Sequence, residues 1–246
     1  MAVQFIIGYI CGIVFILAGY IKNPKRQFRL VQPFSDGTRV FFDDIKNICI
    51  NGFSTASVWL YLMISVQVIN SLILSYGDKM DIQAFSICKN SVNLCYILFL
   101  GIAQTLSPIA GVYAHSGDYD RVRFMLKRSI RYIIAASVIM GLLFALFPQL
   151  IMLLYGVEDP QSMAYLSSCL RIYTLAFPGL AFTLLMNYYF QAIRQQKLST
   201  FLTILEGLIL PVGLATLLTP HFGMNGIWTA LIASEAVSVL FIIEPP

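Results

Sequence analysis

Charged residues are scarce in this sequence. Of its 246 residues only 11% are charged and 58% are hydrophobic, and the mean hydropathy is +0.77. A soluble domain of this length carries about a quarter charged residues, because its surface must face water. The composition therefore argues against a soluble protein and predicts an all-α protein that spans a lipid bilayer.

Histidine is also rare, and the cysteines follow no ligand spacing. The two histidines and five cysteines form no pattern typical of a metal site, so we expect no metal and no cofactor. All five cysteines fall within or at the edges of apolar runs, where they are expected to act as small core residues. They are Cys11, Cys49, Cys88, Cys95 and Cys169. Cys88 and Cys95 lie two turns apart on one predicted helix, too far to bridge each other.

Long apolar runs dominate what is present. About 20 apolar residues cross a ~30 Å hydrocarbon core, and seven runs are long enough to do so. They cover residues 2–21, 45–76, 82–113, 130–155, 163–193, 198–218 and 224–243. The first run lacks a basic segment before it, so we interpret it as a retained membrane helix and not as a signal peptide.

Basic residues predict the orientation of these helices. Every second connection is rich in lysine and arginine. The other three connections together contain a single basic residue, Lys79. The basic residues between runs are Lys22, Lys25, Arg26, Arg29, Arg39, Lys46, Arg121, Arg123, Lys127, Arg128, Arg131, Arg194 and Lys197. Basic loops stay in the cytoplasm, which predicts an N-terminus outside and a C-terminus inside. The same residues lie beside anionic headgroups, so the net charge of +4 implies no nucleic-acid partner.

One polar segment divides the chain. Residues 22–44 contain Pro24, Pro33 and Gly37, which is typical of a linker. We therefore predict a membrane helix over 1–21, a cytoplasmic linker over 22–44 and a block of six helices over 45–246.

Four ionisable residues lie well inside predicted helices: Lys89, Arg171, Glu206 and Glu235. A charge near the bilayer centre costs at least about 2.5 kcal/mol, so such residues face the helix bundle or a watery cavity. One interpretation is a site that couples transport to a proton or cation, with Glu206 and Glu235 as the candidates. The other is a pair of structural ion pairs. Glu206 is the stronger candidate, because Gly207 and Pro211 beside it indicate a locally weakened helix.

Polar side chains on several helices could line a substrate cavity. The candidates are Lys89, Asn93, Gln104, Asn51, Tyr61, Arg171, Asn187 and Gln191. Polar packing between helices, without a cavity, would explain the same residues.

Two short motifs match those of other protein classes in part. His115 and Asp120 match the His-x4-Asp spacing of glycerolipid acyltransferases, but no glycine-rich phosphate-binding motif follows. We therefore predict a basic turn there, with no catalytic residues and no enzyme activity. Asp120-Arg121-Val122 resembles the Asp-Arg-Tyr of seven-helix receptors, which leaves a receptor as an alternative function.

Six stretches of the sequence are typical of one transporter family. They are 101-GIAQTLSPIAG-111, 117-GDYDRVR-123, 170-LRIY-173, 177-FPG-179, 189-YFQAIRQQKLS-199 and 222-FGMNGIW-228. On these stretches the chain from Ile45 onward resembles the second lobe of multidrug and toxic compound extrusion (MATE) transporters. The resemblance implies a lobe of six helices, preceded by the last helix of a first lobe and the link between lobes.

The resemblance also implies a function. The family exports organic cations and drugs across the cell membrane in exchange for H+ or Na+, through a cavity between two lobes. The partners would be the bilayer, amphipathic cations, and a first lobe or a second copy of the chain. One branch of the family has an acidic residue in the first helix of this lobe, but 51–70 and 177–191 contain none. A lipid-linked oligosaccharide flippase of the same superfamily is the alternative.

Overall fold

The computed structural model describes residues 10–15, 42, 45 and 60–243. Residues 10–15 are helical and belong to a unit over Met1–Ser54, whereas the remaining helices form a second unit over Thr55–Pro246. Most of the linker over 22–44, Asn51, Cys49 and most of the first apolar run lie outside the described residues. The rest of this section concerns residues 60–243.

These residues are helical throughout, apart from short turns. The first described helix covers Leu60–Tyr76. The others are α3 (Lys79–His115), α4 (Tyr119–Leu146), α5 (Pro148–Leu154), α6 (Pro160–Tyr173), α7 (Phe177–Ala192), α8 (Gln196–Ile204), α9 (Leu210–Phe222) and α10 (Met224–Ile243). A 3-10 turn, η1 (Thr174–Ala176), joins α6 to α7, and a π-helical segment, η2 (Leu205–Ile209), joins α8 to α9.

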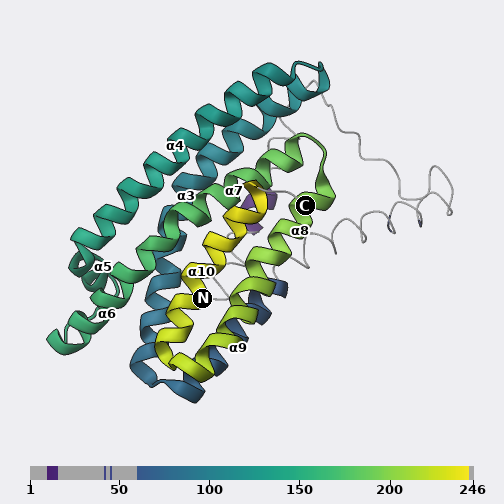
Figure 1. The fold of residues 1–246 in the computed structure, drawn as a ribbon. Coiled ribbons are helices and arrows are strands. Elements are labelled where there is room, and N and C mark those ends of the chain that lie inside the picture. The colour runs from purple at the N-terminus through teal and green to yellow at the C-terminus, as the bar shows by residue number, and fades with distance from the viewer. Residues whose placement is uncertain (1–9, 16–41, 43–44, 46–59, 244–246) are drawn as a thin grey trace. The chain divides into compact units, whose positions relative to one another are not determined.

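Successive helices run back and forth. Figure 1 shows the α3–α4 and α7–α8 connections at one end, and the α5–α6 and α9–α10 connections at the other. Helix α7 lies at the centre, because it packs against α3, α4, α8 and α10. Its buried side chains, among them Phe177, Ala181 and Leu185, join the core of the unit. The arrangement is a bundle of membrane-length helices with one central member.

Prolines divide two of the predicted runs. The run over 130–155 is broken at Phe147, where Pro148 begins α5. The run over 163–193 consists of α6, η1 and α7, with Pro178 in the first turn of α7. Because proline has no N–H and clashes with the preceding turn, it tends to kink or break a helix. Pro108 lies inside α3, which continues past it as a single helix.

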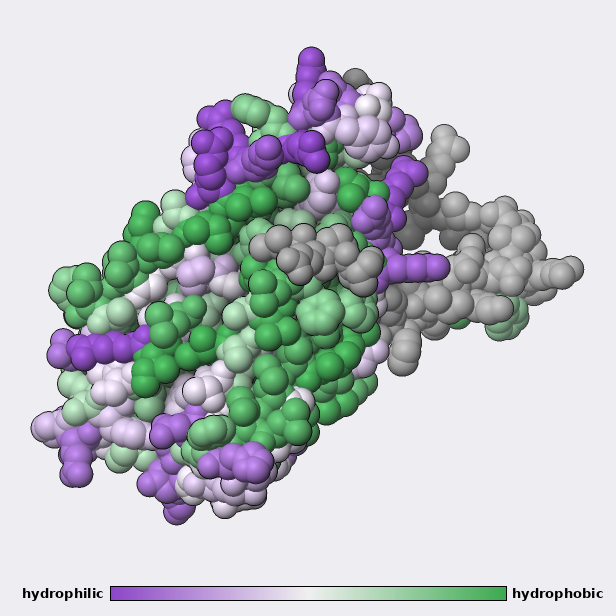
Figure 2. All heavy atoms as spheres, viewed as in Figure 1, coloured by the Kyte–Doolittle hydropathy of each residue, from purple (hydrophilic) through white to green (hydrophobic). Residues whose placement is uncertain are grey.

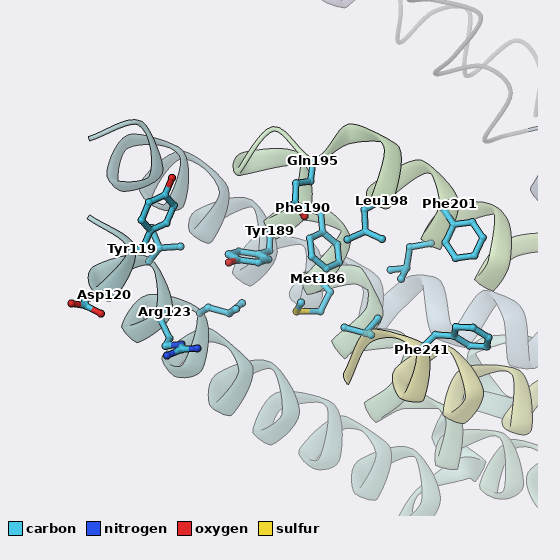
Figure 3. Close-up of a pocket in the computed structure, with 14 residues that line it drawn as sticks. Tyr119, Asp120, Arg123, Met186, Tyr189, Phe190, Gln195, Leu198, Phe201 and Phe241 are labelled. Carbon is cyan, nitrogen blue, oxygen red and sulfur yellow. The ribbon is translucent and has the colours of Figure 1, made fainter. Parts of the chain in front are cut away.

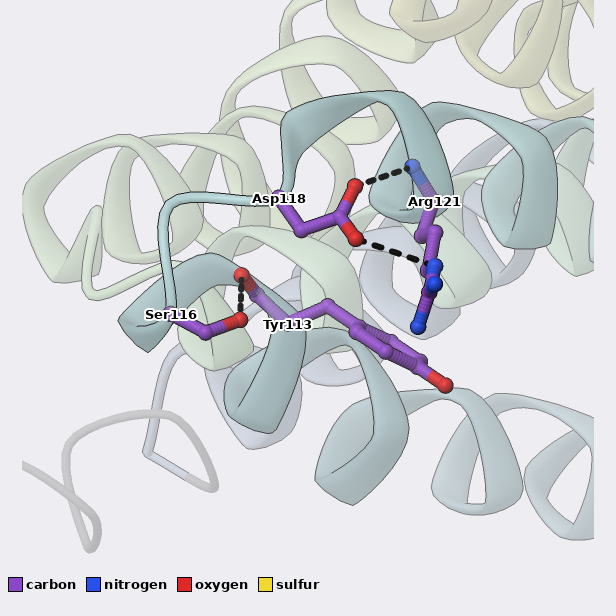
Figure 4. A network of polar contacts seen from close by, with 4 residues as sticks. All are labelled: Tyr113, Ser116, Asp118 and Arg121. Atoms are coloured by element: carbon purple, nitrogen blue, oxygen red, sulfur yellow. Dashed lines mark hydrogen bonds and ion pairs between the residues drawn. The ribbon is translucent and has the colours of Figure 1, made fainter.

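Side-chain caps fix the turns. Figure 4 shows the α3–α4 turn, where Asp118 accepts a hydrogen bond from the Arg121 backbone at 3.2 Å and pairs with its guanidinium at 3.0 Å. The Ser116 hydroxyl donates to the Tyr113 carbonyl at 2.9 Å. The Arg121 guanidinium also lies 5.4 Å from the centre of the Tyr113 ring. The segment around His115 and Asp120 is therefore a tight capped turn, as the sequence predicts.

The surface is apolar where a bilayer would contact it. Five helices in the described part are long and apolar enough to cross a membrane, and Leu60–Tyr76 is a shorter apolar helix. Figure 2 shows hydrophobic side chains over the middle of the visible face, with hydrophilic ones mainly toward the helix ends. Large hydrophobic residues such as Ile97, Ile139 and Leu217 are exposed on this surface. So much exposed apolar area is unfavourable in water and favourable in lipid.

Candidate functional site

Three ionisable side chains from distant parts of the sequence converge in the bundle. Lys89 comes from α3, Glu206 from η2 and Glu235 from α10. Lys89 interacts electrostatically with both carboxylates, and the two carboxylates interact with each other. Glu235 is buried at 8% exposure, whereas Lys89 and Glu206 are half-buried. The interior of the unit therefore holds one cation and two acids, which we call the charged cluster.

Lys89 forms no direct ion pair with Glu206 or Glu235 in the charged cluster. The ion pair between Arg121 and Asp118 is the only one found within the described part of the chain. One carboxylate oxygen of Glu235 is buried and has no hydrogen-bond partner among the described residues. An unpaired buried oxygen costs about 1–3 kcal/mol, and more when it is charged. A polar atom of this kind is available to bind a proton or a small cation.

Aromatic side chains surround Lys89. Its amine lies 5.9 Å from the centre of the Phe85 ring, one turn earlier on α3. It also interacts with the hydroxyl of Tyr173, at the end of α6. The Tyr173 ring packs edge-on against Trp228 of α10, with 6.2 Å between ring centres. Tyr173 thus connects the lysine to the same helix that carries Glu235.

The backbone near Glu206 is irregular. Residues 205–209 are π-helical, and the Leu210 N–H donates to the carbonyl of Leu205, five residues back. Pro211 follows in the first turn of α9 and has no N–H to donate. Such π-helical turns occur often at functional sites, because they re-aim side chains and leave backbone groups free. The weakened helix predicted beside Glu206 is present.

Helix α10 approaches α7 closely at Glu235. A Cβ atom on Gly179 would lie 2.8 Å from the Cβ of Glu235 and 3.4 Å from its carbonyl oxygen. This distance is shorter than real Cβ contacts allow, so only glycine fits at this position. Because Gly179 has no side chain, α10 can approach α7 closely at Glu235.

Arg171 does not join the charged cluster. Its side chain is exposed at the end of α6, and its Nε donates to the carbonyl of Ala145 at 3.1 Å. Of the two expectations for such residues, the helix bundle or a watery cavity, Arg171 does not meet the first within this unit. The carbonyl it contacts is near the end of α4, where Pro148 interrupts the helix and leaves carbonyl groups without helical partners.

The polar candidates separate into two groups. Asn187 and Gln191 of α7 form a hydrogen-bonded network with Ser199 and Thr203 of α8. The Asn187 amide donates to Thr203 at 2.8 Å, and the Gln191 amide donates to Asn187 and Ser199 at 3.1 Å each. Ser199 also donates to Asn187. Asn187 and Gln191 therefore join α7 to α8, which favours polar packing between helices as the interpretation of these two residues.

The remaining candidates are free of this network. Asn93 and Gln104 are exposed on α3, and Tyr61 is half-buried at the start of its helix. They remain candidates for a cavity wall formed with another part of the protein. Sequence reasoning missed Tyr173, Ser199 and Thr203 as functional or supporting residues. The only hint at Tyr173 is its place in the family-like stretch 170–173.

No group of three or more histidine, cysteine or acidic residues that could hold a metal ion occurs among the described residues.

Comparison with known proteins identifies the family. The MatE family model matches residues 52–216, about two thirds of the chain. The chain belongs to the MATE family. This family consists of membrane transporters and not of enzymes, so the seven-helix receptor alternative is wrong and the prediction that the chain is not an enzyme is confirmed.

Solved structures agree at the level of the fold. The chain is similar to an inward-facing multidrug resistance MATE transporter of the MOP superfamily, with a TM-score of 0.75 and 19% identity over 80% of this chain and 46% of that one. The outward-facing form gives a TM-score of 0.72 and 20% identity, over 80% and 44%. A MATE in complex with MaL6 gives 0.72 and 17% identity, over 92% and 51%. No curated protein sequence matches the chain.

The chain spans about half the length of the transporters it matches. It corresponds to one lobe of a MATE transporter, as the sequence indicated. It is also a multi-pass membrane protein, with five apolar helices of membrane length and the shorter apolar helix Leu60–Tyr76 in the described part.

Proposed function

We propose that this MATE lobe takes part in an antiporter that exports organic cations or drugs in exchange for H+ or Na+. Glu206 and Glu235 are the ion-carrying residues in this proposal. The observation that supports it is the convergence of two carboxylates on one lysine, with a Glu235 oxygen that has no described partner. Buried carboxylates in a membrane bundle are costly, and they occur where ions or protons move.

The charge balance of the cluster supports exchange of a single monovalent ion. With Lys89 protonated and both acids ionised, the cluster carries one net negative charge. Binding one proton or one Na+ neutralises it and lowers the cost of keeping it in a low-dielectric interior. Loss of that ion restores the charge, so the cluster has two states that favour different packing of the surrounding helices.

The π-helical segment can convert the change of charge in the cluster into a change of helix angle. Glu206 lies in η2, between two α-helical halves of one membrane span. Helices interrupted in this way bend more readily than continuous ones, and they occur at the binding sites of transporters. A change of charge at Glu206 would therefore alter the angle between α8 and α9.

The rest of the assignment follows the sequence. The N-terminus of the first predicted helix lies outside the cell, residues 22–44 form a cytoplasmic linker, and 45–246 form the six-helix lobe in the cell membrane. A first lobe or a second copy of this chain completes the substrate cavity. Asn93, Gln104 and Tyr61 are candidates for the wall on this side, and the exposed Arg171 remains a weaker candidate.

The flippase alternative fits the cluster less well. A lipid-linked oligosaccharide carries a pyrophosphate, which requires basic residues. Only Lys89 supplies positive charge to the cluster, against Glu206 and Glu235. The charge balance therefore favours a cationic substrate or ion.

Ethidium efflux from energised cells tests the proposal. The chain is expressed alone, and also together with the coding region that precedes it in the genome, each with wild-type residues or with Glu206→Gln. We expect efflux in at least one of the two wild-type cases and its loss in the variant. Asp159→Asn is the matched control, since Asp159 is an exposed acid whose side chain caps α6 at 2.8 Å. Efflux that persists in Glu206→Gln would contradict the role of that carboxylate.

A further inference from the structure

A groove separate from the charged cluster lies where α4, α7, α8 and α10 come together at one end of the bundle. Its volume is about 950 Å³. Figure 3 shows its lining side chains between the start of α4 and the end of α10, with α7 and α8 behind them. At this end lie the α3–α4 and α7–α8 turns, which the positive-inside rule places in the cytoplasm.

The lining of the groove changes from polar to apolar along its length. Arg123 of α4 and Gln195 at the start of α8 lie at the polar side. Met186, Phe201, Leu202 and Phe241 form the apolar side. Phe201 and Phe241 are both exposed, so their rings are accessible from outside the bundle. A molecule that fits this lining has a charged head and a hydrocarbon body.

The residues around the groove are mainly basic, which favours a ligand with a negatively charged head group. Arg123 is exposed and interacts electrostatically with Tyr189, another lining residue. It forms no ion pair with any residue that the structure describes. Asp120 also lines the groove, but Figure 3 shows its carboxylate directed away from the other labelled side chains. The flanking turns and the first turns of α4 add Arg121, Lys127, Arg128, Arg131, Arg194 and Lys197, against Asp118.

The expected depth of the groove in the bilayer also fits a ligand with a charged head and a hydrocarbon body. Arg123 lies in the second turn of α4, and Phe241 lies two residues before the end of α10. Both helix ends are expected at the level of the cytoplasmic headgroups, and the apolar side of the groove extends from there into the hydrocarbon. Basic pockets between membrane helices on the cytoplasmic side bind the headgroups of acidic lipids.

We propose that this groove is a binding site for an acidic phospholipid of the cytoplasmic leaflet. Arg123 contacts the phosphate, and an acyl chain lies against Met186, Phe201 and Phe241. The proposal depends on the predicted orientation and not on the transport function. A lipid held there spans α4, α8 and α10, which have no covalent connection at this level, and it stabilises the way they pack against α7.

Native mass spectrometry of the purified 246-residue chain tests the proposal. The detergent-solubilised protein is mixed with equal amounts of phosphatidylglycerol and phosphatidylcholine, and retained lipids are counted. We expect phosphatidylglycerol to be retained preferentially. Because one basic residue near a lipid surface contributes about fivefold in binding, Arg123→Gln should lower retention of phosphatidylglycerol by about that factor. Arg128→Gln is the matched control, since Arg128 is exposed on the same helix, contacts Tyr132 at 3.0 Å and does not line the groove.

A second measurement locates the lipid. A tryptophan placed by Phe241→Trp, with Trp59→Phe and Trp228→Phe, reports quenching by lipids that carry bromine on the acyl chain. Leu240→Trp serves as the control, because Leu240 is exposed but does not line the groove. We expect brominated phosphatidylglycerol to quench position 241 more strongly than brominated phosphatidylcholine, and to show no such preference at position 240.

Three outcomes would overturn the proposal. Equal loss of lipid in Arg123→Gln and Arg128→Gln would mean that the basic surface attracts lipid without a site. Equal quenching by both lipids at position 241 would mean that the groove does not distinguish phosphatidylglycerol from phosphatidylcholine. Displacement of the lipid by ethidium but not by added phosphatidylglycerol would identify an organic cation as the occupant. Circular dichroism and gel filtration of each variant confirm that it is folded.

Discussion

Gly179 of α7 lies directly against Glu235 of α10, at a distance that leaves no room for a side chain. The Cβ of an alanine there would be 2.8 Å from the Cβ of Glu235. The two helices therefore meet at the acid that we assign to ion exchange, and the position of that acid depends on the residue facing it. Small residues allow this kind of close approach between membrane helices.

Gly179→Ala is expected to destabilise the protein and to impair transport together. Alanine is intrinsically better than glycine in a helix by about 1 kcal/mol, but overpacking at a rigid contact costs about 1–3 kcal/mol. Gly213→Ala is the control, because no described atom lies within 4 Å of the Cβ that it would add. Thermal unfolding in detergent should show a lower midpoint for Gly179→Ala only. An unchanged midpoint in both variants would mean that α7 and α10 separate easily at Glu235.

Lys89→Met is expected to destabilise the bundle by leaving two carboxylates without their cation. Lys89 forms no direct ion pair with either acid and is half-buried, so the loss is expected at about 1–3 kcal/mol, below that of a broken buried salt bridge. Adding Glu235→Gln to Lys89→Met should recover part of that loss, because one uncompensated charge is removed as well. The coupling between the two substitutions, measured by a double-mutant cycle of unfolding free energies, is expected at about 1–3 kcal/mol. Additive effects would show that Lys89 and Glu235 do not interact.

Pro211→Ala is expected to impair transport while the protein stays folded. Pro211 cannot donate to the turn before it, which favours the π-helical geometry of residues 205–209. With alanine the span can become α-helical throughout, and a shift of one residue rotates Glu206 by about 100° relative to α9. Efflux should fall while the unfolding midpoint stays the same or rises. Pro108→Ala is the control, because α3 is already continuous across Pro108; equal loss of efflux in both variants would contradict the argument.

Much of the fold could be predicted from the sequence, because the bilayer imposes a simple rule on apolar runs. The predicted run over 224–243 coincides with α10. Other boundaries differ for physical reasons. Helix α4 begins at Tyr119, eleven residues before its apolar run, because Asp118 caps a basic segment that lies outside the hydrocarbon. Hydropathy contains no information about such a polar helix start.

The charged cluster could be predicted only in part. Lys89, Glu206 and Glu235 were expected in the interior because charge is costly in lipid, and the structure brings them together. Arg171 was expected in the bundle or in a watery cavity; it is exposed and donates to a carbonyl beside a helix break, so only the second expectation is left for it. The partnership of Tyr173 with Lys89 joins residues 84 positions apart, and only tertiary packing defines it.

The orientation of the helices can be tested at two turns. Ser116→Cys lies in the α3–α4 turn and Gln161→Cys at the start of α6, in a background where all five native cysteines are replaced. We expect a membrane-impermeant maleimide to label position 161 on intact cells and position 116 only after the cells are opened. This result follows if the basic connections are cytoplasmic. The reverse pattern would contradict the predicted orientation and would place the groove at the outer leaflet.

Tyr165→Phe is expected to weaken the opposite end of the bundle. Asp81, in the first turn of α3, is buried at 7% exposure and accepts hydrogen bonds from the Tyr165 hydroxyl of α6 and, at 2.9 Å, from the Asp78 backbone. Without the hydroxyl, the buried carboxylate loses a charge-assisted bond between two helices, which costs about 1–3 kcal/mol. Tyr76→Phe is the matched control, since Tyr76 is exposed as Tyr165 is, but its hydroxyl forms no hydrogen bond with a described residue. A lower unfolding midpoint for Tyr165→Phe alone would confirm that this contact joins α3 to α6, and equal midpoints would mean that solvent or lipid headgroups replace the hydroxyl at no cost.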